Sequence, residues 1–372
     1  MQRTEYPLLS PSLGSQKTLV AFHFGVAGAG PKVYIQASLH AEELPGMLVA
    51  HHLRERLEAA EREGHFRGEV ILVPAANPIG LSQRLDHRAM GRFEFDTAQN
   101  FNRHYPDMAA AVLEDALPLM GNDAGANVDT VRRLVGQWLT QWQPASELES
   151  LRRQLLLLSH DADLVLDLHC DTEAVMHLYS EEACWAPFEP LARLLGCRAV
   201  LLARESGGGP FDERLSGLWW QLAAAVKNAG VTAPLPQACA STTVELRGEA
   251  DVSHELARQD AQAIEAFLLH AGVLGGQPSP TLPPMACEPT PLAGSQTLRS
   301  PVPGVLVFLA RPGDRLSVGD VVAEVIDPTA GSARVHAVRA EVPGVFYAAK
   351  PRIALALLPL NRCPAKDFDR LG

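Results

Sequence analysis

The sequence predicts an α/β protein with a mixed, largely parallel sheet flanked by helices, followed by a small C-terminal all-β domain. Up to about residue 272, short apolar β-type runs alternate with longer stretches of helical periodicity, as in a sheet covered by helices. A Pro/Gly-rich segment at 275–284 then interrupts all periodicity, which is typical of a domain boundary. We therefore expect domains at 1–274 and 285–372.

The elements of the first domain follow from hydrophobic patterning. The expected strands are short apolar runs at 18–26, 32–38, 69–74, 163–168, 199–203 and 242–246. The expected helices carry Leu/Val/Ala stripes opposite charged faces, at 44–60, 128–142, 147–158, 215–229 and 254–269. Apolar stripes of this kind indicate helices that cover a sheet.

The C-terminal segment has a different character. Val302-Pro303-Gly304-Val305 recurs at 342–345, with glycine-aspartate turns between the two copies, which indicates short strands joined by turns. This pattern resembles biotinyl/lipoyl-like β-domains. Lys350 and Lys366 do not lie in the hairpin context of the carrier lysine of those domains, so we expect a structural or lid role rather than a carrier role.

Composition excludes several function classes. The chain has 32 Lys and Arg against 43 Asp and Glu, a net charge of -11, which argues against nucleic acid as a partner. No uninterrupted apolar run reaches the roughly 18 residues that a membrane span needs, and no export signal is recognisable at the N-terminal end. The six cysteines are scattered without a C-x-x-C pair, which is typical of reduced thiols. We expect a cytoplasmic globular enzyme.

His40 and Glu43 form the first candidate metal-binding pair. They lie between an expected strand and an expected helix, where a histidine and a carboxylate three residues apart can converge on one ion. An alternative is that Glu42 and Glu43 only interact favourably with the dipole of the helix that follows them, which leaves His40 without a role. Three other histidines also precede an acid by three residues. One of these pairs, His52 and Glu55, lies inside the expected helix 44–60, and we expect it on the solvated face.

His169 is the second candidate, because an apolar strand at 162–168 delivers it at its carboxyl end, where sites of open α/β sheets form. His40, Glu43 and His169 together are two imidazoles and one carboxylate, the ligands of a catalytic zinc site with an open position. The adjacent Cys170 points to the opposite face of the strand, so we expect a core thiol.

Zinc-dependent hydrolysis also needs a general base, and Glu245 is the candidate. A carboxylate is unfavourable inside its β-forming run unless it lines a site. The alternative is an exposed Glu on an edge strand, paired with Arg247. Asn102-Arg103 is a candidate substrate clamp, since an Arg fork binds a carboxylate through two bonds. The alternative is an ordinary surface loop.

Five motifs occur in a fixed order: H-x-x-E at 40–43, N-P-x-G at 77–80, N-R-x-x-P at 102–106, D-L-H at 167–169 and V-E-L at 244–246. In this order they resemble the succinylglutamate desuccinylase/aspartoacylase family, relatives of the zinc carboxypeptidases, over most of residues 30–255. The resemblance implies a zinc carboxypeptidase-like fold. It also implies one Zn²⁺ per chain, bound by His40, Glu43 and His169. By the same resemblance, Glu245 is the catalytic base, and Asn102 and Arg103 bind a carboxylate of the substrate.

The family also has an oxyanion-stabilising Arg upstream of the Asn-Arg pair. Arg92 is its nearest counterpart, with Arg84 and Arg88 as alternatives. The expected function is that of a zinc-dependent amidohydrolase that deacylates an N-acyl amino acid or a similar small amide. The alternatives are a zinc carboxypeptidase and a non-catalytic binding protein. The expected partner is a small acylated amino acid, with no nucleic acid and no membrane, and the chain is a possible homo-oligomer.

Overall fold

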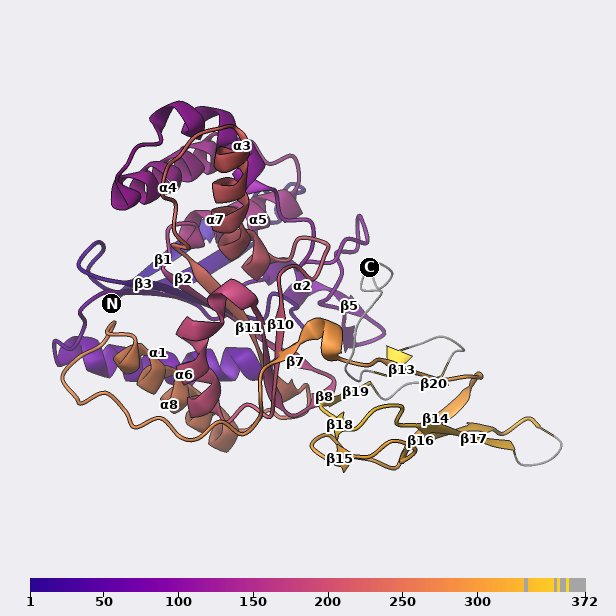
Figure 1. Cartoon of the computed structure of the whole chain (residues 1–372). Helices are drawn as coiled ribbons and strands as arrows, with labels where there is room; N and C mark the ends of the chain where they lie inside the picture. Colours follow the sequence, from indigo (N-terminus) through magenta and orange to yellow (C-terminus); the bar gives the residue numbers. More distant parts are fainter. Residues whose placement is uncertain (331–333, 351–352, 355–358, 361–372) are drawn as a thin grey trace.

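A nine-stranded mixed sheet forms the centre of the computed structural model, which describes residues 1–330, 334–350, 353–354 and 359–360 (Figure 1). Its strand order is β1-β2-β4-β3-β7-β11-β9-β10-β12, and five of the eight pairings are parallel. Together with the helices and the small C-terminal antiparallel sheets, this architecture confirms the predicted fold class. Cys363 and Lys366 lie outside the described residues.

The bounds of the elements are as follows. The sheet strands are β1 (Gln2–Pro7), β2 (Thr18–Gly25), β3 (Lys32–Ala37), β4 (Glu69–Val73), β7 (Leu164–Asp171), β9 (Met176–Glu181), β10 (Ala199–Ala203), β11 (Ala240–Gly248) and β12 (Thr290–Pro291). The helices of two or more turns are α1 (Pro45–Arg62), α3 (Met108–Ala116), α4 (Ala124–Gln141), α5 (Glu147–Ser159), α6 (Trp185–Leu195), α7 (Phe211–Asn228) and α8 (His254–His270). Short elements are α2 (Pro78–Ser82), β5 (Arg84–Leu85), β6 (Arg88–Ala89) and β8 (Glu173–Ala174).

Helices cover both faces of the sheet. Figure 1 shows α1, α6 and α8 on one face and α3, α4, α5 and α7 on the other. On the first face, Leu53 of α1 and Phe267 of α8 belong to one buried cluster with Leu166 and Leu168 of β7. Burying a side chain of this size contributes about 1.5–3 kcal/mol, so the apolar stripes recognised in the sequence hold the helices on the sheet. None of the described helices combines the length and the apolar character required to span a membrane.

All six predicted strands and all five predicted helices are present, but several elements were missed. The longest missed ones are β1, α3, α6 and β9. Helix α6 contains Pro190, a residue that argues against a helix interior. Strand β9 carries polar residues among its apolar ones, yet His177 and Ser180 are buried. The ring of His177 packs edge-on against Tyr347, and the Ser180 hydroxyl donates to the Ser241 carbonyl of β11.

The C-terminal module consists of short antiparallel sheets. The largest contains β14 (Gly304–Phe308), β16 (Val321–Asp327), β17 (Arg334–Arg339) and β20 (Ile353–Ala354), and smaller ones contain β13 (Leu298–Arg299), β15 (Arg315–Leu316), β18 (Gly344–Val345), β19 (Ala348–Ala349) and β21 (Pro359–Leu360). Strand β19 pairs with β8, which directly follows β7. Tyr347 packs with Val175 and Leu201 in a shared cluster. The module therefore contacts the main sheet near the carboxyl end of β7.

Candidate metal centre

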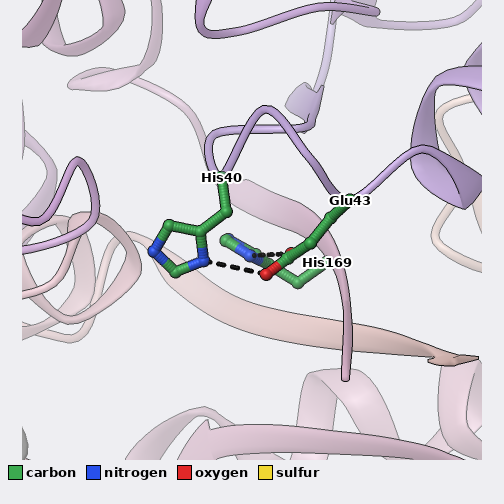
Figure 2. Close-up of side chains that lie close together, drawn as sticks. All are labelled: His40, Glu43 and His169. Carbon is green, nitrogen blue, oxygen red and sulfur yellow. Dashed lines mark hydrogen bonds and ion pairs between the residues drawn. The ribbon is translucent and has the colours of Figure 1, made fainter. Parts of the chain in front are cut away.

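Two neighbouring parallel strands bring the predicted metal ligands together. Ala37, the last residue of β3, pairs with Leu168 of β7, so His40 and His169 both emerge at the carboxyl ends of these strands. Glu43 lies in the turn that leads into α1, and its carbonyl accepts a hydrogen bond from the Ser38 hydroxyl at 2.6 Å. The motifs at 40–43 and 167–169 therefore form one cluster at the edge where sites of such sheets form (Figure 2).

The carboxylate of Glu43 lies between the two imidazoles. Nδ1 of His40 is 3.0 Å from its Oε1, and Nδ1 of His169 is 2.8 Å from its Oε2. The three residues are at most 3% exposed, and one ligand atom from each lies within 4.8 Å of the others. Two imidazole nitrogens and a carboxylate that converge in this way match the ligand set of a catalytic zinc site.

The second nitrogen of each imidazole also faces a polar group. Nε2 of His40 is 2.9 Å from Oδ1 of Asn100, and Nε2 of His169 is 3.0 Å from Oδ2 of Asp167, although at a poor hydrogen-bond angle. The Asn100 oxygen favours protonation of Nε2 of His40, and the charge of the Asp167 carboxylate favours a proton on Nε2 of His169, which leaves the Nδ1 lone pairs for a metal ion. The sequence analysis assigned no role to Asn100 or Asp167. Asp167 had a signal, since it opens the D-L-H motif.

The charges in the cluster influence one another. Burial, followed by the charge of Arg92, lowers the pKa of His40 to about 4. Burial also opposes protonation of His169, but the carboxylates of Asp167 and Glu43 raise its pKa well above the usual range. Burial alone would raise the pKa of Glu43, but the two neighbouring imidazoles lower it well below its usual value. A divalent cation at this position would compete with the proton on His169, so we expect metal binding to release a proton.

Glu245 lies beside this cluster. On β11 it pairs in register with His169 of β7 on one side and with His177 of β9 on the other. Its Oε2 is buried and has no hydrogen-bond partner among the described residues. Burial, followed by the negative charge of Glu43, raises the pKa of Glu245 to about 8.

The alternative for Glu245, an exposed edge-strand residue paired with Arg247, is wrong. Strand β11 is internal to the sheet, between β7 and β9. Arg247 instead pairs with Asp260 of α8. Its left-handed backbone, with φ of 64°, interrupts the strand next to the site. The expectation for Cys170 is confirmed, because this thiol is 4% exposed and belongs to the core cluster on the α1 and α8 face.

Arg92 differs from the other two candidate arginines in its position. Its Nη1 is 3.1 Å from Oε1 of Glu43, and its side chain lines the cavity above the cluster. Arg84 and Arg88 lie in the exposed β5–β6 hairpin, and neither lines that cavity. The guanidinium of Arg84 donates to two backbone carbonyls of its own loop, of Leu81 and Gln83.

Asn102 and Arg103 both line the same cavity. Asn102 is buried; its Oδ1 accepts a hydrogen bond from the backbone amide of Phe211, and its Nδ2 is 3.5 Å from Nε2 of His169. Nη1 of Arg103 donates to the Asn102 carbonyl at 2.7 Å. The side chain of Arg103 runs over Gly208, where a Cβ would lie 2.7 Å from Cδ of Arg103. The pair is therefore part of the cavity wall and not of a surface loop.

The cavity has a volume of about 170 Å³ and contains charges of both signs. The sequence analysis missed several of its lining residues: Tyr179, Glu181, Asp212, Glu213 and Lys350. Lys350 belongs to the C-terminal module and lies 4.0 Å from the Asp171 carboxylate. No sequence signal pointed to it, because its place in the cavity depends on how the module packs against the main sheet.

Similarity to known proteins agrees with this geometry. The model of the succinylglutamate desuccinylase/aspartoacylase catalytic domain matches residues 29–271. The chain belongs to the succinylglutamate desuccinylase/aspartoacylase family. Members of this family are zinc-dependent deacylases that act on acylated amino acids. No curated protein sequence is significantly similar to the chain.

Several solved structures share the fold along nearly the whole chain. A family protein from Shewanella amazonensis SB2B is 26% identical, with a TM-score of 0.82 and coverage of 97% of this chain and 98% of that one. One from Shewanella frigidimarina NCIMB 400 is 24% identical, with a TM-score of 0.80 and coverage of 98% and 97%. The product-bound ectoine utilization protein EutE (DoeB) from Ruegeria pomeroyi is 17% identical, with a TM-score of 0.63 and coverage of 97% and 94%.

Proposed function

We propose that this family member is a zinc-dependent amidohydrolase that removes the acyl group from an N-acyl amino acid or a similar small amide. The observation that carries the proposal is the position of Glu245. Its carboxylate has a buried oxygen without a hydrogen-bond partner in the part of the chain that the structure describes, and it lies one strand away from His169, in register. A carboxylate that is not itself one of the clustered ligands but lies next to them is placed to act as a general base.

His40, Glu43 and His169 would hold the ion. A zinc ion bound there acts as a Lewis acid on the amide carbonyl and makes a nearby water more acidic. Glu245 takes a proton from the attacking water as the new C–O bond forms. It then gives that proton to the amine nitrogen as the C–N bond breaks, so that the products are a carboxylate and a free amine. A base with a pKa near neutrality can perform both transfers, and burial raises the pKa of Glu245 toward that range.

The cationic side chains of the cavity fit the polar groups of such a substrate. Arg92 lies beside the ligand cluster, where its guanidinium would stabilise negative charge that develops on the carbonyl oxygen. Asn102 and Arg103 would bind the carboxylate of the amino acid, for which a guanidinium fork is well suited. Lys350, contributed by the C-terminal module, also lines the cavity, which fits the proposed lid role of the module.

Hydrolysis assays on zinc-loaded protein test the proposal. The substrates are a series of N-acyl amino acids and, for comparison, short peptides with a free C-terminus. We expect release of free amino acid from N-acyl amino acids, loss of activity after chelation, and recovery when zinc is restored. Turnover of peptides alone would instead indicate a carboxypeptidase. No turnover of either class would favour a non-catalytic binding protein.

The variant His169→Ala is the matched control for these assays. Removing one of three ligands leaves an incomplete site, so we expect this variant to lose stoichiometric zinc as well as activity. Full zinc occupancy in the variant would show that the ion is held elsewhere, and would refute the ligand assignment independently of any substrate.

A further inference from the structure

A second histidine cluster lies on the outer part of α1, on the face of the sheet that α8 also covers. In the described part of the chain, two groups bring three potential ligand atoms within 4.8 Å of one another: the site above, and His51, His52 and Glu55. The sequence analysis expected His52 and Glu55 on the solvated face of the helix. For His52 this is wrong, because its side chain is only 6% exposed, whereas those of His51 and Glu55 are 46% and 56% exposed.

Both imidazoles are directed at the same carboxylate. Nε2 of His51 is 3.6 Å from Oε1 of Glu55, and Nδ1 of His52 is 3.3 Å from Oε2. Helical spacing explains this arrangement, since residues three and four positions apart lie on one side of a helix. An ion with bonds of about 2.1 Å needs tetrahedral ligand atoms about 3.4 Å apart. The two His–Glu distances, one to each carboxylate oxygen, are close to this spacing, and the three ligand atoms lie within 4.8 Å of one another.

The other nitrogen of His52 contacts the neighbouring helix. Nε2 of His52 is 2.9 Å from Nδ1 of His254, the first residue of α8. Histidines that bind a metal commonly donate their second ring N–H to an acceptor, which fixes the tautomer and the ring orientation. If Nε2 of His52 donates to His254, the lone pair on Nδ1 is directed toward Glu55 and is available to an ion.

We propose that His51, His52 and Glu55 form a second metal site, for a divalent transition ion of the zinc, nickel or copper class. Two imidazoles favour such ions over magnesium or calcium, which prefer oxygen ligands. Glu55 supplies a negative charge, and the exposure of His51 and Glu55 leaves the remaining coordination positions to water. His254 acts as a positioning residue that holds the His52 ring.

The three ligands lie on α1, and His254 links the site to α8. Each of these two helices follows a segment that carries a candidate catalytic-site residue. Helix α1 begins two residues after Glu43, and α8 begins six residues after the end of β11, the strand that carries Glu245. An ion that fixes the tautomer of His52 strengthens its hydrogen bond to His254, and so strengthens the contact between α1 and α8. Because the ion binds the folded protein, we expect it to raise thermal stability by mass action.

Titration of Ni²⁺ into protein that already holds one equivalent of zinc tests the proposal by calorimetry. We expect wild-type protein to bind one further equivalent. We expect His51→Ala, a substitution at a half-exposed position, to weaken this binding at least tenfold. His254→Ala should weaken it by about 10–100-fold, the usual effect of losing a residue that orients a metal-bound histidine. The melting temperature should rise with Ni²⁺ in wild type and not in His51→Ala, which needs no activity measurement.

His65→Ala is the matched control, because His65 also contacts a carboxylate, that of Glu63 at 3.3 Å, but belongs to no three-ligand group among the described residues. We expect its Ni²⁺ isotherm to match that of wild type. The absence of a further equivalent in wild type, or an unchanged isotherm in His51→Ala, would overturn the proposal. Abolished binding in His254→Ala together with intact binding in His51→Ala would place the ion between His52 and His254 and would also overturn it.

Discussion

His169 and Glu245 lie opposite each other on neighbouring parallel strands, so their side chains emerge from the same face of the sheet. This places a candidate metal ligand and the candidate base next to each other through backbone pairing alone. A shift of one residue in that pairing would turn Glu245 to the other face of the sheet. The relative position of ligand and base is therefore fixed by two central strands of the core and does not depend on a loop.

Asp167→Asn should weaken metal binding without preventing folding. The carboxylate of Asp167 accepts a hydrogen bond from Gln36 at 3.0 Å, which an Asn amide oxygen can also accept. The amide nitrogen of Asn would then face Nε2 of His169 and favour the tautomer with a proton on Nδ1, the nitrogen needed for the ion. We expect a loss of about 10–100-fold in zinc affinity, measured by competition with a chromophoric chelator. Equal affinity in both proteins would show that Asp167 does not orient His169.

Arg103→Lys should weaken substrate capture more than turnover. A lysine ammonium is a point charge and cannot reproduce the two parallel hydrogen bonds that a guanidinium makes to a carboxylate. We expect kcat/KM to fall, mainly through KM, on N-acyl amino acids with a free carboxylate. The same substrates with the carboxylate converted to an amide serve as the control and should discriminate little between the two proteins. An unchanged kcat/KM on the free acids would remove Arg103 from the binding site.

Glu181→Gln should flatten the dependence of stability on pH. Burial raises the pKa of Glu181 to about 7 in the folded protein, against 4.5 for an unperturbed Glu. Between these values the folded state holds the proton more tightly than the unfolded state, so stability falls as pH rises through the window. The shift corresponds to a loss on the order of 3 kcal/mol by pH 8.

Urea denaturation at pH 5, 6, 7 and 8 measures this effect. Wild type should lose stability across the series, and Glu181→Gln should lose less. Glu182→Gln is the matched control, because Glu182 is the exposed neighbour of Glu181. Parallel pH profiles for wild type and Glu181→Gln would contradict the account.

The ligand residues could be predicted because each is marked by its local context. His40 and His169 both follow apolar runs, and sheet topology then requires that adjacent parallel strands end together. Glu245 could be proposed from a carboxylate inside a β-forming run, although only the strand order excludes the surface alternative. The family resemblance added the roles of these residues, which their spacing alone does not specify.

Other parts of the site depend on contacts between segments far apart in the chain. Lys350 enters the cavity because the C-terminal module packs beside β8, and no pattern around Lys350 indicates that docking. Asn100 contacts His40 across 60 residues of sequence. His52 has the spacing of an exposed helix position, but His254 of α8 packs over it. Packing between elements determined each of these outcomes.

Steady-state kinetics of zinc-loaded Glu245→Gln, with the metal content of the same sample, test the central claim most directly. Gln keeps the shape of the side chain but cannot take a proton from water. The account predicts one zinc per catalytic site, as in wild type, and a loss of at least about 10²–10⁴-fold in the hydrolysis of N-acyl amino acids. Near-wild-type turnover by the zinc-loaded variant would contradict the account, even if His40, Glu43 and His169 proved to be the ligands.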